Sequence, residues 1–129
     1  MYLLDTNICV ALLKDGDVGV RRRLASLEGE VCLCSIVRSE LVYGAHHSTR
    51  VKENTARLER LFALFPSAPF DDEAADICGN LRSHFRKLGT PIGAADLMIA
   101  STALSIGAVV VTRNEHDFRR VPGLRVEVW

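Results

Sequence analysis

The chain has 129 residues, 48% of them hydrophobic and 25% charged, which is typical of a globular protein and excludes a disordered or fibrous one. No apolar run could span a bilayer, and Asp5 interrupts the first apolar segment, so we expect no membrane span and no signal peptide and place the chain in the cytoplasm. The formal net charge of zero gives no overall case for nucleic-acid binding, although arginines cluster locally.

Short apolar runs alternate with helical patterns along the chain. Runs without polar alternation predict strands buried on both faces, whereas alternation near the end of the chain predicts an edge strand. Apolar residues at three- and four-residue spacings predict helices. In chain order, we expect strand 2–4, helix 18–27, strand 31–34, helix 36–47, helix 52–65, strand 68–70, helix 73–88, helix 94–106, strand 108–111 and strand 125–128.

Capping residues support these boundaries. Gly89 and Gly107 stand just past two periodic stretches, where left-handed helix ends favour glycine. Asp71 or Asp72 can cap the helix that begins near residue 73. Strands that alternate with helices predict a three-layer α/β/α fold, a single domain over residues 1–129, with a mainly parallel sheet of four to five strands.

Three carboxylates fall at related places in this predicted fold. Asp5 ends the first strand, where open α/β sheets place their binding sites, and it either coordinates a ligand or caps the following helix. Glu40 borders the apolar stripe of helix 36–47, so it is either a partly exposed helix residue or a carboxylate that needs a counter-charge. Asp96 could simply favour the start of helix 94–106, but the small residues that follow would also let that helix approach the sheet.

Carboxylates that share a site repel one another unless a cation or protons neutralise them. Mg²⁺ and Mn²⁺ prefer oxygen ligands, and such ions can activate water and stabilise charge on a phosphate. The acidic residues therefore indicate hydrolysis of a phosphodiester.

Four sequence blocks, taken together, resemble PIN-domain ribonucleases and, within that family, the VapC-type toxins of toxin–antitoxin pairs. The resemblance covers essentially the whole chain, including VPGLR at residues 121–125. The four blocks are LLDTN at 3–7, SELVYGA at 39–45, ADLMIA at 95–100 and VTRNEHDF at 111–118.

This resemblance implies a Mg²⁺- or Mn²⁺-dependent endoribonuclease with Asp5, Glu40 and Asp96 as its acidic core and Asp5 and Asp96 as the metal ligands. It implies that Thr6 and Asn7 shape the loop after the first strand, which would lie centrally in the sheet, and that Thr112 lies beside the metal. It also implies a homodimer, inhibition by a small VapB antitoxin in a hetero-oligomer, and a structured RNA substrate such as tRNA cut in the anticodon loop.

One position departs from the family pattern. Many relatives have an acidic residue where this chain has Asn114, so we assign Asp117 as the fourth acid. Whether the site binds a second metal ion therefore stays an open question. Arg82 and Arg86 share a helix face and either contact RNA phosphates or form a solvated surface.

Two other functions remain as alternatives. The missing acid at Asn114 fits a catalytically silent PIN module that binds RNA or a partner protein. A phosphotransfer enzyme with Asp5 as nucleophile ranks last, because Asn7 occupies the place of the second acid in the usual Asp-x-Asp arrangement.

Overall fold

The computed structural model describes residues 1–14 and 17–129. In that part of the chain, five strands form one sheet in the order β3-β2-β1-β4-β5, and every neighbouring pair is parallel. The expected strands are confirmed to within two residues at their ends, the first strand is central, and the last is at an edge. The strands are β1 (Tyr2–Leu4), β2 (Val31–Cys34), β3 (Ser67–Ala68), β4 (Val109–Thr112) and β5 (Val126–Val128).

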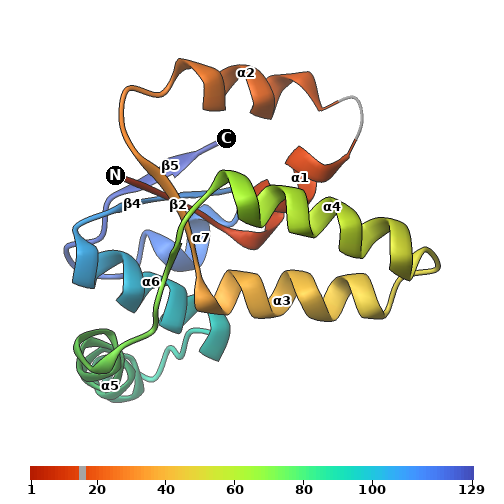
Figure 1. The fold of residues 1–129 in the computed structure, drawn as a ribbon. Coiled ribbons are helices and arrows are strands. Elements are labelled where there is room, and N and C mark those ends of the chain that lie inside the picture. Colours follow the sequence, from red (N-terminus) through yellow and green to blue (C-terminus); the bar gives the residue numbers. More distant parts are fainter. Residues whose placement is uncertain (15–16) are drawn as a thin grey trace.

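Helices flank the sheet and confirm the α/β fold. In Figure 1, α2 lies above the strands, whereas α5 and α6 lie below them. The five expected helices appear with ends shifted by no more than one residue. The helices are α1 (Thr6–Leu13), α2 (Val18–Ser26), α3 (Ser35–His46), α4 (Val51–Leu64), α5 (Asp72–Leu88), α6 (Ala94–Ile106) and α7 (Glu115–Phe118).

Helices α1 and α7 were not delimited by the sequence patterns. The segment TNICVALL of α1 is apolar over most of its circumference, so it shows no clear period of 3.6 residues. Helix α7 is a single turn of four residues, too short to show any period.

The core fills both sides of the sheet. Leu3 and Leu4 on β1 and Val110 and Val111 on β4 are fully buried, as expected for strands covered by helices on both faces. Several small side chains of α6 are also buried, which lets this helix pack closely on the sheet. They are Ala100, Ser101, Thr102 and Ala103.

The predicted caps are confirmed. The Asp71 carboxylate accepts a hydrogen bond from the backbone N–H of Ala74 at 3.0 Å and begins α5. Gly89 and Gly107 end α5 and α6 with φ angles of 71° and 66°, a left-handed conformation that favours glycine.

Within residues 1–14 and 17–129, no helix combines the length and the apolar character that crossing a membrane requires.

The register between β1 and β4 positions the residues that follow them. Leu4 pairs with Val111, and the backbone N–H of Asp5 donates to the Val111 carbonyl at 2.9 Å. Asp5 and Thr112 are therefore neighbours at the carboxyl end of the sheet, although 107 positions separate them in the chain.

Candidate active site

Asp5 is the most buried carboxylate of the site, with only 4% of its surface exposed. One carboxylate oxygen accepts a hydrogen bond from the Thr6 backbone N–H at 2.8 Å, and the other accepts from the Thr112 hydroxyl at 2.7 Å. Asp5 is also the residue that caps α1. The two sequence interpretations of Asp5 are therefore compatible, because its carboxylate caps a helix and also faces the cleft described below.

Thr112 connects two parts of the site. Its buried hydroxyl donates to Asp5 and accepts a hydrogen bond from the Asn114 backbone N–H at 2.9 Å. These two bonds fix the turn that follows β4 relative to the end of β1.

Glu40 reaches the site from α3. Its side chain is exposed, and its Oε1 accepts a hydrogen bond from the Thr6 hydroxyl at 2.7 Å. Val37 and Leu41 on either side of Glu40 are buried, which confirms that Glu40 lies at the border of the buried face.

Asp96 lies in the first turn of α6. Gly93, not Asp96, occupies the N-cap position of this helix. The Asp96 carboxylate accepts a hydrogen bond from the Asn114 side-chain amide at 3.1 Å. Capping therefore does not explain Asp96. Its side chain points instead toward the turn after β4.

Burial and mutual repulsion raise the pKa of both aspartates. For Asp5, burial raises the pKa most, hydrogen bonds from Thr112 and Thr6 lower it, and repulsion from Glu40 raises it. For Asp96, burial and then the charges of Asp5, Asp117 and Glu40 raise the pKa to about 6, against the lowering effect of Asn114. These carboxylates lie close enough to disfavour the simultaneous presence of all their negative charges.

The three acids line one cleft of about 510 Å³ at the carboxyl end of the sheet. Asp5, Glu40 and Asp96 come from three different elements of the fold, as the sequence predicted. Three of the seven other predicted site residues line the same cleft: Thr6, Asn7 and Asn114.

Asp117, predicted as the fourth acid, lies near Asp96 but does not line this cleft. Its charge contributes to the raised pKa of Asp96, while its own carboxylate pairs with Arg120 at 3.4 Å. In this segment, Arg113 and Asn114 line the cleft. The role of Asp117 therefore stays a prediction.

Arg82 and Arg86 lie elsewhere. They are exposed on α5 and line a separate hollow of about 640 Å³ between α5 and α6, together with apolar residues such as Phe85 and Met98. The structure therefore does not bring these two arginines into the acidic cleft.

The cleft also contains residues that were not predicted from the sequence as site residues. Asp17 and Lys14 line it, as does Arg113, which had been noted only as part of a motif. A guanidinium nitrogen of Arg113 pairs with Asp17 at 3.0 Å, and the Arg113 backbone N–H donates to the Asn7 side chain at 3.2 Å. The position of Asp17 before a helix signals only a cap, so no sequence pattern could have indicated its pairing with Arg113.

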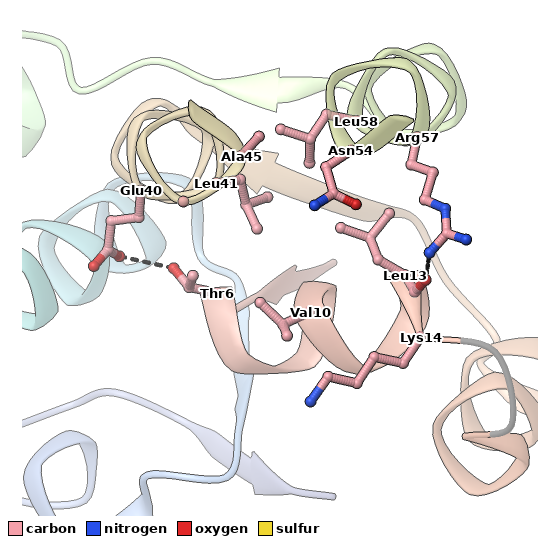
Figure 2. Close-up of a pocket in the computed structure, with 11 residues that line it drawn as sticks. Thr6, Val10, Leu13, Lys14, Glu40, Leu41, Ala45, Asn54, Arg57 and Leu58 are labelled. Carbon is pink, nitrogen blue, oxygen red and sulfur yellow. Dashed lines mark hydrogen bonds between the residues drawn. The ribbon is translucent and has the colours of Figure 1, made fainter. Parts of the chain in front are cut away.

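A smaller apolar groove of about 310 Å³ adjoins the cleft (Figure 2). Helices α1, α3 and α4 form it, and Leu13, Leu41 and Leu58 are among its apolar lining residues. The groove shares Thr6, Val10, Lys14 and Glu40 with the acidic cleft. A molecule that filled the groove would therefore touch the mouth of the cleft.

Comparisons with known proteins agree with this geometry. The family described as "PIN domain" matches residues 2–124. The "tRNA(fMet)-specific endonuclease VapC" of Shigella flexneri is 38% identical over 128 residues, which cover 99% of this chain and 97% of the relative. "Ribonuclease VapC2" of Haemophilus influenzae is 34% identical over the same shares of the two chains.

Solved structures show the same fold. A chain of DNA-bound VapBC from Salmonella typhimurium matches with a TM-score of 0.93 and 38% identity, covering 99% of this chain and 97% of that one. A chain of VapBC2 from Rickettsia felis bound to promoter DNA matches with a TM-score of 0.88 and 33% identity, covering 99% and 98%. The chain therefore belongs to the PIN domain family, and within it to the VapC ribonucleases of toxin–antitoxin systems.

Proposed function

We propose that this chain is a Mg²⁺- or Mn²⁺-dependent endoribonuclease toxin that a VapB-type antitoxin neutralises. The observation that carries the proposal is the convergence of Asp5, Glu40 and Asp96 on one cleft, where the pKa values of both aspartates are raised. Perturbed carboxylates in a cleft are typical of sites that bind a cation or move protons.

The side chains of the cleft fit a hard divalent cation. The candidate ligands are carboxylate oxygens, which Mg²⁺ and Mn²⁺ prefer. Across residues 1–14 and 17–129, no group of three or more acidic, histidine or cysteine side chains is close enough to enclose an ion alone. Mg²⁺ does not need such an enclosure, because it usually keeps several waters and binds proteins through one or two carboxylates. Asp5 and Asp96 would supply those carboxylates, with Glu40 completing the site.

The residues of the chain would divide the work of hydrolysis. A bound Mg²⁺ would lower the pKa of water and stabilise charge that develops on the phosphate. Thr112 and the Thr6 backbone N–H hold the Asp5 carboxylate in one orientation, and the Asn114 amide does the same for Asp96. Glu40, exposed at the cleft and anchored by the Thr6 hydroxyl, can accept a proton from the attacking water.

For the substrate, we propose a structured RNA, with initiator tRNA cut in the anticodon loop as the first candidate. The support is the name of the Shigella flexneri relative, a tRNA(fMet)-specific endonuclease. Sequencing the 5′ ends that appear after brief induction tests this proposal. Ends confined to one loop of one tRNA would support it, whereas ends scattered over many messenger RNAs would refute it. We further propose that the chain acts in the cytoplasm, where such RNA is available.

For the antitoxin, we propose that an apolar and acidic segment lies in the groove of Figure 2. Apolar side chains line the groove, and Lys14 and Arg57 place positive charge there. Because the groove opens on the acidic cleft, its occupant would hinder access of RNA. Val10 is 38% exposed and lines both hollows, so Val10→Glu should weaken copurification of toxin and antitoxin. Val51→Glu, equally exposed at the start of α4, is the matched control, and equal weakening by both would refute this placement.

We also propose that the toxin forms a homodimer, alone and within the toxin–antitoxin complex. The support is the likeness to the VapBC structures over nearly the whole chain. Light scattering after size-exclusion chromatography measures the mass directly. A mass of about one chain at every concentration tested would refute the homodimer.

RNA cleavage in the presence and absence of EDTA tests the enzymatic proposal. Wild-type protein should cleave with Mg²⁺ and stop when EDTA is added. Asp5→Asn and Asp96→Asn should each slow cleavage by about a hundredfold or more, since each removes a charged ligand worth several kcal/mol in the transition state. Asp72→Asn, an exposed acid on α5 outside the cleft, should leave the rate unchanged. Full activity of Asp5→Asn and Asp96→Asn would refute the assignment, and no cleavage of any RNA by the wild type would favour a silent RNA-binding or protein-binding module.

A further inference from the structure

Arg113 lies between the two residues that orient the acidic ligands. Thr112 before it holds Asp5, and Asn114 after it holds Asp96. The backbone N–H of Arg113 itself donates to Asn7 on α1. The main chain at Arg113 is therefore fixed relative to the proposed metal site from three directions.

The side chain of Arg113 is also held in place. One of its terminal nitrogens lies 3.0 Å from a carboxylate oxygen of Asp17, whose other oxygen accepts a hydrogen bond from Val20 in the first turn of α2. The guanidinium group has five N–H donors, and 46% of the Arg113 side chain is exposed where it lines the cleft. Donors other than the one bonded to Asp17 can reach a ligand in the cleft.

The charges of the cleft create a need for such a donor. Asp5, Glu40 and Asp96 would repel the phosphates that flank the cleaved bond, and a single divalent cation offsets only two of these three charges. Among the described residues, Lys14 and Arg113 are the cations that line the cleft. Of these, Arg113 carries the planar donor pair that suits two oxygens of one phosphate.

We propose that Arg113 binds a backbone phosphate of the RNA next to the cleaved bond, and that Asp17 is the positioning residue that aims its guanidinium group. This inference rests on the proposed function and extends it to a specific contact with the RNA backbone. The competing explanation is that the Arg113–Asp17 pair only clamps the end of β4 to the start of α2.

Equilibrium binding of RNA separates the two explanations. The probe is a fluorescein-labelled single-stranded RNA of random sequence, measured by fluorescence anisotropy in EDTA at several salt concentrations. The host protein carries Asp5→Asn, so that binding is read without cleavage. Arg113→Gln should weaken binding about tenfold and reduce the slope of log K against log salt by about 0.7, the contribution of one phosphate contact to a single strand. Arg113→Lys should retain the slope.

Two further variants exclude a merely structural effect. Arg119→Gln removes an equally charged side chain that is 57% exposed, pairs with Glu115 and lies outside the cleft, so it should leave the slope unchanged. Asp17→Asn keeps the cation and a good helix cap but no longer aims the guanidinium group, so it should leave the slope unchanged and weaken binding by about threefold at every salt concentration. Binding by Asp17→Asn as tight as that of the host protein would overturn the positioning role of Asp17. Equal slopes for Arg113→Gln and the wild-type sequence, or the same loss for Asp17→Asn and Arg113→Gln, would overturn the proposal. Since this assay needs no cleavage, its outcome is separate from the test of ribonuclease activity.

Discussion

Replacing Thr112 with valine tests whether one buried hydroxyl organises the acidic site. The substitution conserves shape but removes a donor to Asp5 and an acceptor for the Asn114 backbone N–H. Thr112 is fully buried and Asp5 is 4% exposed, so water cannot easily replace the lost partners.

The expected cost follows from these two bonds. The bond to a charged carboxylate contributes about 1.5–3 kcal/mol, and the neutral bond from the backbone contributes about 0.5–1.5 kcal/mol. The free energy of unfolding of Thr112→Val should therefore fall by about 2–4 kcal/mol. Thr112→Ser keeps the hydroxyl and loses one buried methyl group, so its free energy of unfolding should fall by only about 1 kcal/mol.

Urea unfolding followed by circular dichroism at pH 7 measures both variants under the same conditions. We expect the wild type to be the most stable, Thr112→Ser to be less stable, and Thr112→Val to be the least stable. If Thr112→Val proved as stable as Thr112→Ser, the hydroxyl would not be the element that holds Asp5, and this reasoning would be wrong.

Three other predictions concern the charges of the site and the helix caps. Because the pKa of Asp96 is raised from 3.8 to about 6, the metal-free folded state should lose stability as the pH rises from about 4 to about 6. Mg²⁺ should therefore raise the melting temperature more at pH 7 than at pH 5, and equal shifts in melting temperature would contradict the assignment of Asp96 as a ligand. Asn114→Asp replaces the amide that donates to Asp96 with a like charge, so it should lower the free energy of unfolding of the metal-free protein by about 1–2 kcal/mol. The same variant should bind Mg²⁺ more tightly in calorimetry, and an unchanged Mg²⁺ affinity would count against Asn114 lying beside the ion. Gly89→Ala, at a φ of 71°, should destabilise the protein by about 1 kcal/mol in urea unfolding. Gly79→Ala within the same helix, with open space around the added methyl, should stabilise the protein by about 0.5–1 kcal/mol. If both substitutions changed the free energy of unfolding in the same direction, the explanation of the helix cap would be wrong.

Much of the fold follows from local patterns in the sequence. Apolar runs such as 2–4 and 108–111 predicted strands because neither face of these strands meets water. Glycines at 89 and 107 predicted helix ends because few other residues adopt their backbone angles. The same patterns predicted that Asp5 would stand at the end of a strand, whereas the family resemblance implied the central place of that strand in the sheet.

Contacts between segments that lie far apart in the chain could not be predicted from local sequence patterns. The pairing of Arg113 with Asp17 spans 96 positions and depends on where α2 begins in space, which no local pattern encodes. Asp117 was predicted as the fourth acid because it lies near Asn114 in the sequence. The structure adds that the turn of α7 directs its carboxylate to Arg120, three residues along the chain.

The central claim is that Asp5 and Asp96 hold a divalent metal at the carboxyl end of the sheet. Anomalous diffraction from crystals of the protein soaked in Mn²⁺ tests it most directly. We predict a strong peak in the acidic cleft, about 2 Å from carboxylate oxygens of Asp5 and Asp96, and its loss in Asp96→Asn. A cleft without a peak at saturating Mn²⁺, or a peak that persists unchanged in Asp96→Asn, would contradict the account.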